Sequence, residues 1–146
     1  MSEASNTISK QLIDIFENVI HMERDTINKE ANTKLSMTEI HTIAATGSDE
    51  LESMSVIAGK LHVTVGTLTV AMKHLSEKGY VERYKSEKDR RIVKIGLTKQ
   101  GKEIYRIHEE FHRELGRRLT NGMTEGEALV VKRAIANLEE FIRQGC

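Results

Sequence analysis

The sequence has very little cysteine and contains neither proline nor tryptophan. Of the 146 residues, only Cys146 carries a thiol. A single thiol can form neither an internal disulfide nor a thiolate zinc cage, so nothing in the sequence points to an oxidising compartment. We interpret Cys146 as an incidental terminal thiol rather than a redox switch.

Long apolar runs are also missing. No segment approaches the roughly 18 consecutive apolar residues of a membrane-spanning helix, and the N-terminal MSEASNTISK lacks the basic-then-apolar order of a signal peptide. At 38% hydrophobic residues the chain is still able to bury a real core. We therefore expect a folded, soluble, cytoplasmic protein without a membrane partner.

The net charge is zero, because 22 Lys and Arg balance 22 Asp and Glu. The charges are nevertheless unevenly distributed. Residues 1–59 contain 4 basic and 10 acidic groups (net −6), residues 60–106 contain 12 and 5 (net +7), and residues 107–146 contain 6 and 7 (net −1). A solvated surface usually intersperses the two signs, so the basic middle third favours contact with a polyanion such as DNA.

Apolar spacing predicts a mainly α-helical chain with one small β-hairpin. Helical periodicity and capping residues predict six helices, over about 7–30, 36–47, 53–61, 64–78, 98–121 and 124–142. Alternating residues predict two strands at 80–85 and 92–97, joined by the charged tip 86–91. Two short helices followed by a basic hairpin predict a winged helix-turn-helix at about 36–98.

The predicted helix 64–78 has a face suited to DNA. At about 100° per residue, its outward side carries Gly66, Thr69, Val70, Lys73 and Glu77. Gly66 permits close backbone approach, a threonine hydroxyl can bond a phosphate or base, Val70 can contact a thymine methyl, and Lys73 can contact a guanine edge or phosphate. The candidate contacts on this helix are Thr64, Gly66, Thr67, Thr69, Val70 and Lys73. The alternative is a polar face that only meets solvent.

The hairpin tip concentrates basic residues within seven positions: Lys85, Lys88, Arg90 and Arg91. A narrow minor groove has enhanced negative potential and attracts inserted arginine, so the tip is a second candidate DNA contact. We expect Asp89 to hold the tip open by accepting hydrogen bonds from a nearby arginine or from backbone amides. The alternative is a loop that serves only solubility.

Three segments resemble the signature of the MarR family of winged-helix repressors: LSEKGYVER at 75–83, DRR at 89–91 and LTKQG at 97–101. In that family an Asp-x-Arg is followed by five residues, Leu-Thr, and a Gly three positions beyond the Thr. The resemblance covers residues 1–146 as a single MarR-like domain. It implies a homodimer formed by the first and last two helices, about 7–30 and 98–146, bound to a pseudo-palindromic operator on double-stranded DNA.

A closer likeness within the family is carried by SMTEIHTI (36–43), the stretches 63–83 and 86–112, and NGMTEGE (121–127). These are similar to the FabT-type repressors of fatty-acid synthesis genes. That likeness implies long-chain acyl groups on acyl carrier protein as corepressor, and no other cofactor. The apolar residues that could line an acyl site are Phe16, Ile20, Ile40 and Ile107. The same residues lie on helical stripes that also fit core packing.

Histidines offer an alternative within the same fold. His108 and His112 lie one turn apart, and His41 on the helix 36–47 could converge with them as a zinc site, with Glu23 the nearest candidate for a fourth ligand. The zinc-sensing branch of the MarR family places histidines at comparable positions. An enzyme is not expected, because no nucleophile with its base and no carboxylate pair is evident. A pure interaction protein is the remaining alternative.

Overall fold

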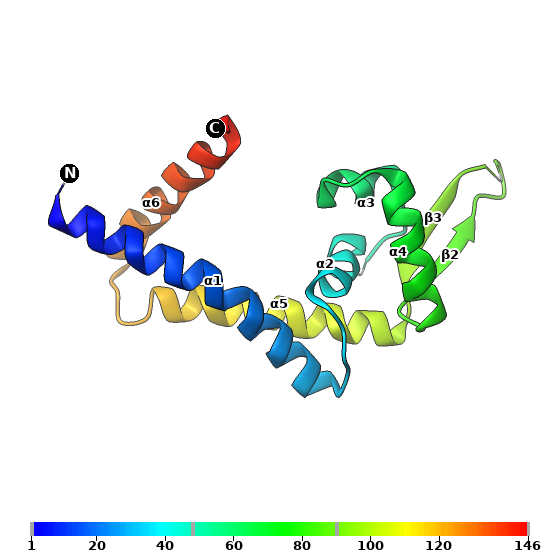
Figure 1. Ribbon diagram of the computed structural model, residues 1–146, viewed down its shortest axis with the longest axis horizontal. Helices are drawn as coiled ribbons and strands as arrows, with labels where there is room; N and C mark the ends of the chain where they lie inside the picture. The colour runs from blue at the N-terminus through cyan, green and yellow to red at the C-terminus, as the bar shows by residue number, and fades with distance from the viewer. Residues whose placement is uncertain (1, 48, 90, 146) are drawn as a thin grey trace. The chain divides into compact units, whose positions relative to one another are not determined.

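The computed structural model describes residues 2–47, 49–89 and 91–145 (Figure 1). The chain divides into two compact units, residues 1–111 and 112–146. The described residues form six helices and three strands, which confirms the predicted fold class. They are α1 (Glu3–Ala31), α2 (Met37–Thr46), β1 (Glu52–Ser53), α3 (Met54–Leu61), α4 (Val65–Glu77), β2 (Val81–Lys85), β3 (Val93–Leu97), α5 (Lys99–Leu119) and α6 (Glu125–Gln144).

The exit from α1 is held by one asparagine side chain. Asn28 donates from Nδ2 to the carbonyl of Leu35 at 2.8 Å, and its Oδ1 accepts from the Leu35 amide at 2.8 Å. This pair satisfies both backbone groups of Leu35 and fixes the polar stretch before α2. The helix begins at Glu3, earlier than the predicted start near residue 7.

Local capping residues determine where α2, α3 and α4 begin. Ser36 and Glu39 form the predicted capping box of α2, while Ser53 and Thr64 accept amide hydrogen bonds at the starts of α3 and α4. The three-residue turn 62–64 separates α3 from α4, which are bent by 103° relative to one another. That angle and turn length are typical of a helix-turn-helix.

The sheet has the order β1-β3-β2 and is antiparallel throughout. Pairing of β2 with β3 places Val81 opposite Leu97 and Lys85 opposite Val93, which makes the predicted hairpin. Strand β1, in which Glu52 pairs with Ile95, was not predicted. Two residues are too short to show a period of two, so no sequence signal distinguishes this strand from a polar loop.

The core lies in the first unit, around α2, α3, α4, the sheet and the first half of α5. Its fully or almost fully buried side chains are Ile27, Leu35, Ile40, Ile43, Ile57, Ala58, Leu68, Met72, Leu75, Val81, Ile95, Leu97, Ile104 and Ile107. Among the described residues no single helix is long and apolar enough to cross a membrane, although α3 and α4 would pass such a test as a bent pair.

The Leu-Thr-x-x-Gly pattern ties the start of α5 to the end of α4. Thr98 Oγ1 donates to the Gly79 carbonyl at 2.6 Å and accepts from the Gly101 amide at 3.1 Å. A Cβ at Gly101 would come within 2.1 Å of the Tyr80 carbonyl oxygen, so only glycine fits there. The pattern is therefore a packing device that fixes the base of the hairpin.

The second unit contains the end of α5 and all of α6. Thr124 and Glu127 form the predicted capping box of α6, and hydrogen bonds from Thr124 to the Glu127 carboxylate lower the pKa of that group. On α5, Arg117 and Arg118 both pair with Glu114, at 3.0 and 2.8 Å. None of the residues 112–145 is buried within the single chain.

Candidate DNA-binding interface

Helix α4 presents the predicted face to solvent. Leu68, Met72 and Leu75 are buried and anchor the helix on its inner side. On the opposite side the residues predicted to face outward are all exposed: Gly66, Thr69, Val70, Lys73 and Glu77. The burial of one face and exposure of the other agree with the orientation predicted from helical spacing.

The threonine hydroxyls on α4 are less available than the sequence suggests. Thr64 Oγ1 accepts from the Thr67 amide at 3.1 Å and donates to Thr67 Oγ1 at 3.0 Å. Thr69 Oγ1 donates to the Val65 carbonyl one turn earlier, at 2.8 Å. In this conformation the Thr69 proton is engaged within the helix, so its oxygen is left as an acceptor, and contact between Thr69 and DNA stays a prediction.

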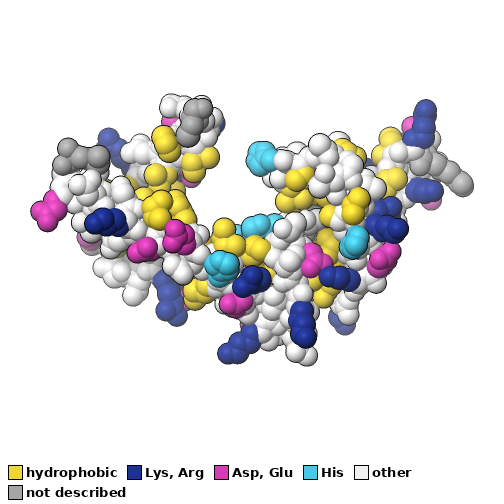
Figure 2. All heavy atoms as spheres, in the orientation of Figure 1, with side chains coloured by type: hydrophobic (Ala, Val, Ile, Leu, Met, Phe, Trp, Pro, Cys, Tyr) yellow, Lys and Arg dark blue, Asp and Glu magenta, His cyan; other side chains and the backbone are white. Residues whose placement is uncertain are grey.

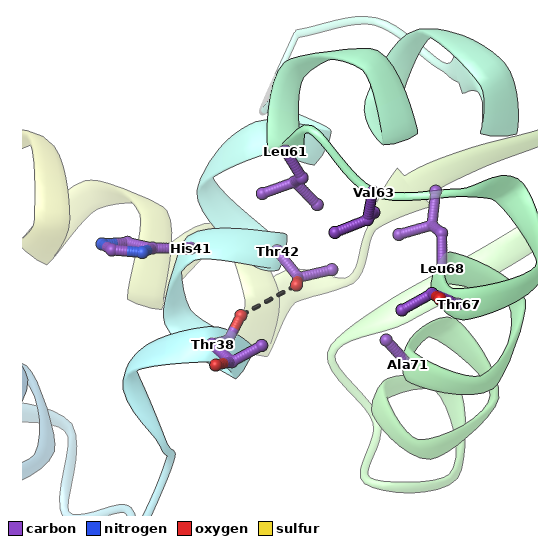
Figure 3. A pocket seen from close by; sticks show the side chains of 8 residues that line it. All are labelled: Thr38, His41, Thr42, Leu61, Val63, Thr67, Leu68 and Ala71. Carbon is purple, nitrogen blue, oxygen red and sulfur yellow. Dashed lines mark hydrogen bonds between the residues drawn. The ribbon is translucent and has the colours of Figure 1, made fainter. Parts of the chain in front are cut away.

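A hollow of about 180 Å³ lies between α2, the end of α3 and α4 (Figure 3). Thr67, a predicted DNA contact, lines this hollow together with Leu68 and Ala71 of α4. On the α2 side Thr42 donates to the Thr38 carbonyl at 2.8 Å. Thr67 is thus exposed but also lines the hollow on the α2 side of the helix. It is therefore a weaker candidate for DNA contact than Val70.

Asp89 accepts hydrogen bonds at the hairpin tip, as predicted. Asp89 Oδ1 accepts from the Arg91 amide at 3.0 Å and from Arg91 Nε at 3.2 Å. The Arg91 side chain is still 92% exposed, so most of its donors face solvent. Lys85 and Lys88 are exposed as well. Arg90 lies outside the described residues.

Two contacts that join the elements of the interface were not predicted from the sequence. Arg83 on β2 donates from Nη2 to the Thr69 carbonyl on α4 at 3.4 Å. Lys78, at the end of α4, pairs with Glu39 of the α2 capping box at 2.5 Å. The partners are 14 and 39 residues apart. Local periodicity carries no information about such pairs.

The Glu39 carboxylate is stabilised in its charged form. Partial burial acts to raise the pKa of Glu39, but hydrogen bonds from Lys78 and Ser36 and the Lys78 charge together lower it below its usual value. Glu39 therefore neutralises Lys78 at the end of α4.

Figure 2 shows that other Lys and Arg side chains gather on the surface formed by α4 and the hairpin. This cationic surface matches the electrostatic requirement for contact with phosphates.

The four candidate acyl-lining residues occupy two different environments. Ile40 and Ile107 are fully packed in the core, with 0% and 1% exposure. Phe16 and Ile20 are exposed on α1. Ile40 and Ile107 therefore serve core packing, and of the four only Phe16 and Ile20 present apolar surface to a ligand.

The histidines are only partly brought together. His108 Nε2 lies 2.9 Å from Glu23 Oε1, and both side chains are buried in the first unit. The rings of His41 and His108 meet edge to face with their centroids 6.5 Å apart. His112 lies one turn farther along α5. Within the first unit His108 is therefore paired with a carboxylate that joins α1 to α5.

A helix-turn-helix whose second helix exposes one face, followed by a basic hairpin, defines a winged-helix DNA-binding protein. Residues 35–93 match the model of the MarR family. The crystal structure of Streptococcus pneumoniae FabT in complex with DNA superposes with a TM-score of 0.85, at 35% identity over 96% of this chain and 98% of that one. The chain belongs to the MarR family.

Two curated relatives support this membership. The regulator SarZ of Staphylococcus saprophyticus is 32% identical over 107 residues, covering 71% of this chain and 72% of SarZ. The uncharacterised regulator YhjH of Bacillus subtilis is 27% identical over 111 residues, covering 74% of this chain and 63% of YhjH. These relatives are HTH-type transcriptional regulators, so the chain is a DNA-binding transcriptional regulator and not an enzyme. Their descriptions do not favour the zinc alternative.

Proposed function

We propose that the chain is a homodimeric repressor of fatty-acid synthesis genes, with long-chain acyl-acyl carrier protein as its corepressor. The observation that carries this proposal is the similarity to FabT in complex with DNA, at 35% identity over nearly the whole chain. The likeness extends through the helices on both sides of the winged region. A shared architecture outside the DNA-binding elements favours shared regulation as well as shared DNA binding.

Exposed apolar side chains support the homodimer. Helix α6 carries Leu129, Val130, Phe141 and Ile142, each at least 60% exposed in the single chain. Helix α1 exposes a further set, Ile8, Ile13 and Ile15. Apolar surface on this scale is typical of a protein–protein interface. A second copy would bury it and would pair two α4 helices for an operator with two half-sites.

An acyl chain has enough binding energy to act as a corepressor. Burial contributes about 0.8 kcal/mol per methylene. A ligand shifts a conformational equilibrium only by its difference in affinity for the two states, and a long chain can supply a large difference. Of the four predicted lining residues, Phe16 and Ile20 are accessible to such a chain.

The experiment is a titration of labelled operator with the dimer, in the presence of long-chain acyl-acyl carrier protein or unacylated carrier protein. We expect the acylated form to tighten operator binding and the unacylated form to leave it unchanged. A zinc chelator should leave the affinity untouched. Equal effects of the two carrier proteins would contradict the corepressor role. A chelator effect abolished by joint His108→Ala and His112→Ala substitution would replace it with metal sensing.

A further inference from the structure

We propose that α4 recognises thymine in the major groove through methyl groups, contributed by Val65, Thr69 and Val70. The proposal rests on the DNA-binding role of this helix and specifies the chemistry by which it selects a sequence. The three side chains lie within the first turn and a half of α4. In helix-turn-helix proteins it is the N-terminal residues of the second helix that contact base edges.

The hydroxyl protons of Thr64 and Thr69 are already engaged at the start of α4. Thr69 donates to the Val65 carbonyl at 2.8 Å, and Thr64 donates to Thr67 Oγ1 at 3.0 Å. A threonine whose proton is bonded to its own helix presents its methyl group and an acceptor lone pair to a partner. Thr69 is exposed, so its methyl group is available for contact.

Two valines of α4 are exposed. Val70 is 59% exposed and Val65 is 46% exposed. A single exposed valine is ordinary on a protein surface. Val70 lies on the outward face of the helix that the fold assigns to DNA, and Val65 is exposed at its first position. Together with Thr69, they present methyl groups on the N-terminal part of α4.

Helix α4 has few of the side chains that form paired hydrogen bonds with bases. Its sequence, VGTLTVAMKHLSE, is fully described and contains no Arg, Asn or Gln. Of the residues that form the common bidentate contacts with guanine and adenine it has only Lys73, which lies in the second half of the helix. Besides Thr69, the other side-chain donors on α4 are Thr67, His74 and Ser76. The thymine methyl is the apolar group on the major-groove edges, so it is the feature that this surface complements.

The test begins with selection of a preferred duplex from random DNA by the full-length protein. Each thymine of the selected site is then exchanged for deoxyuridine, which removes the C5-methyl and keeps the base pair. We expect about fourfold weaker binding for each contacted thymine, the equivalent of one buried methyl group. Unchanged affinity after exchange at every position would overturn the proposal.

Variants identify which side chain makes each contact. Val70→Ala and Val65→Ala should each remove the preference for thymine over deoxyuridine at one position of a half-site. Lys73→Ala should weaken binding to both duplexes and leave their ratio intact. Val56→Ala removes an exposed valine from α3 and serves as the matched control with no effect on the ratio. Full discrimination in both α4 valine variants would overturn the assignment, and circular dichroism checks that each variant is folded.

The design separates this proposal from the DNA-binding role on which it rests. If selection enriches no sequence, the role of α4 in sequence-specific binding fails, and the methyl proposal fails with it. If a sequence is enriched but deoxyuridine binds as well as thymine, only the methyl proposal fails.

Discussion

The winged lobe, residues 35–107, and the C-terminal segment, residues 112–146, differ sharply in how they bury apolar groups. All but one of the buried hydrophobic side chains among the described residues lie in the winged lobe, the exception being Ile27 of α1. The C-terminal segment has apolar residues at helical spacing but no buried residue between 112 and 145. In α6, Phe141 and Ile142 are 64% and 71% exposed.

The helices of the winged lobe and those of the C-terminal segment are stabilised in two different ways. Helices α2, α3 and α4 are short, but each has apolar residues in a shared core that offset the conformational entropy of ordering them. In proteins most of a helix's stability comes from packing of its apolar face, and α6 has no buried residue within the single chain. The apolar residues of the winged lobe are therefore packed within one chain, whereas those of the C-terminal segment would be packed against the proposed second copy.

The most disruptive test of this comparison is Phe141→Asp in α6. Burial of a phenylalanine contributes about 1.5 to 3 kcal/mol, and a two-fold interface contains it twice, so the dimer dissociation constant should rise by about 100-fold or more. Sedimentation equilibrium measures the change. Glu139→Ala, on an exposed polar position of the same helix, should leave the dimer intact. A parent protein that is monomeric would contradict the comparison at once.

Leucine truncations in the two regions sharpen the comparison. Leu68→Ala in the winged lobe should lower the free energy of unfolding by about 2 to 5 kcal/mol, because it leaves a cavity in the core. Leu129→Ala in α6 should instead weaken the dimer and leave amide hydrogen exchange in α4 unchanged at a concentration where the dimer persists. Equal loss of protection in α4 for both variants would show that the two regions do not differ as described.

In the hairpin, Arg91→Ala should lower operator affinity by about 1 to 3 kcal/mol while the protein stays folded. The Arg91 side chain is 92% exposed and is oriented by Asp89. Arg106→Ala provides the control, because Arg106 is also exposed but pairs with Glu103 on α5. Gel-shift titration measures both variants. Similar affinity for the parent and the Arg91 variant would remove the hairpin tip from the DNA interface.

At the start of α4, Thr64→Ala should lower the stability of the winged lobe by about 1 kcal/mol, because the Thr67 amide loses its acceptor. Thr64→Ser keeps that acceptor and should retain most of the stability. Urea unfolding monitored by circular dichroism distinguishes them. Equal midpoints for the alanine and serine variants would show that the cap contributes little.

The smallest expected effect is a pH dependence at Glu39. Its pKa is lowered from the ordinary value of 4.5, so the carboxylate contributes stability that is present above about pH 4.5 and is lost as the pH falls below it. Glu39→Gln should therefore make the acid-induced loss of stability shallower. Unfolding by urea at a series of pH values measures the slope, and parallel curves for the parent and the variant would contradict this role.

The helices, the hairpin and the turn before α4 could be predicted because their signals are local. Ser36, Thr64 and Thr124 mark helix starts by satisfying amides within three residues of themselves. The pairs Arg83 with Thr69 and Lys78 with Glu39 could not be predicted, since tertiary packing alone brings them together.

Residue roles were harder to predict than elements. Helical spacing predicts that Ile40 and Ile107 lie on the apolar faces of their helices, but it does not distinguish a core from a ligand site. Both side chains are in the core. Likewise the outward position of Thr69 follows from spacing, while the hydrogen bond that engages its hydroxyl depends on its rotamer.

We expect one chain to supply a complete winged lobe and two chains to be needed for a complete regulator. Sedimentation of the protein with its selected duplex tests this expectation by giving the mass of the complex. We expect two chains on one duplex, whose selected sequence contains two half-sites in inverted orientation. One chain per duplex, on a site without two-fold symmetry, would contradict the account.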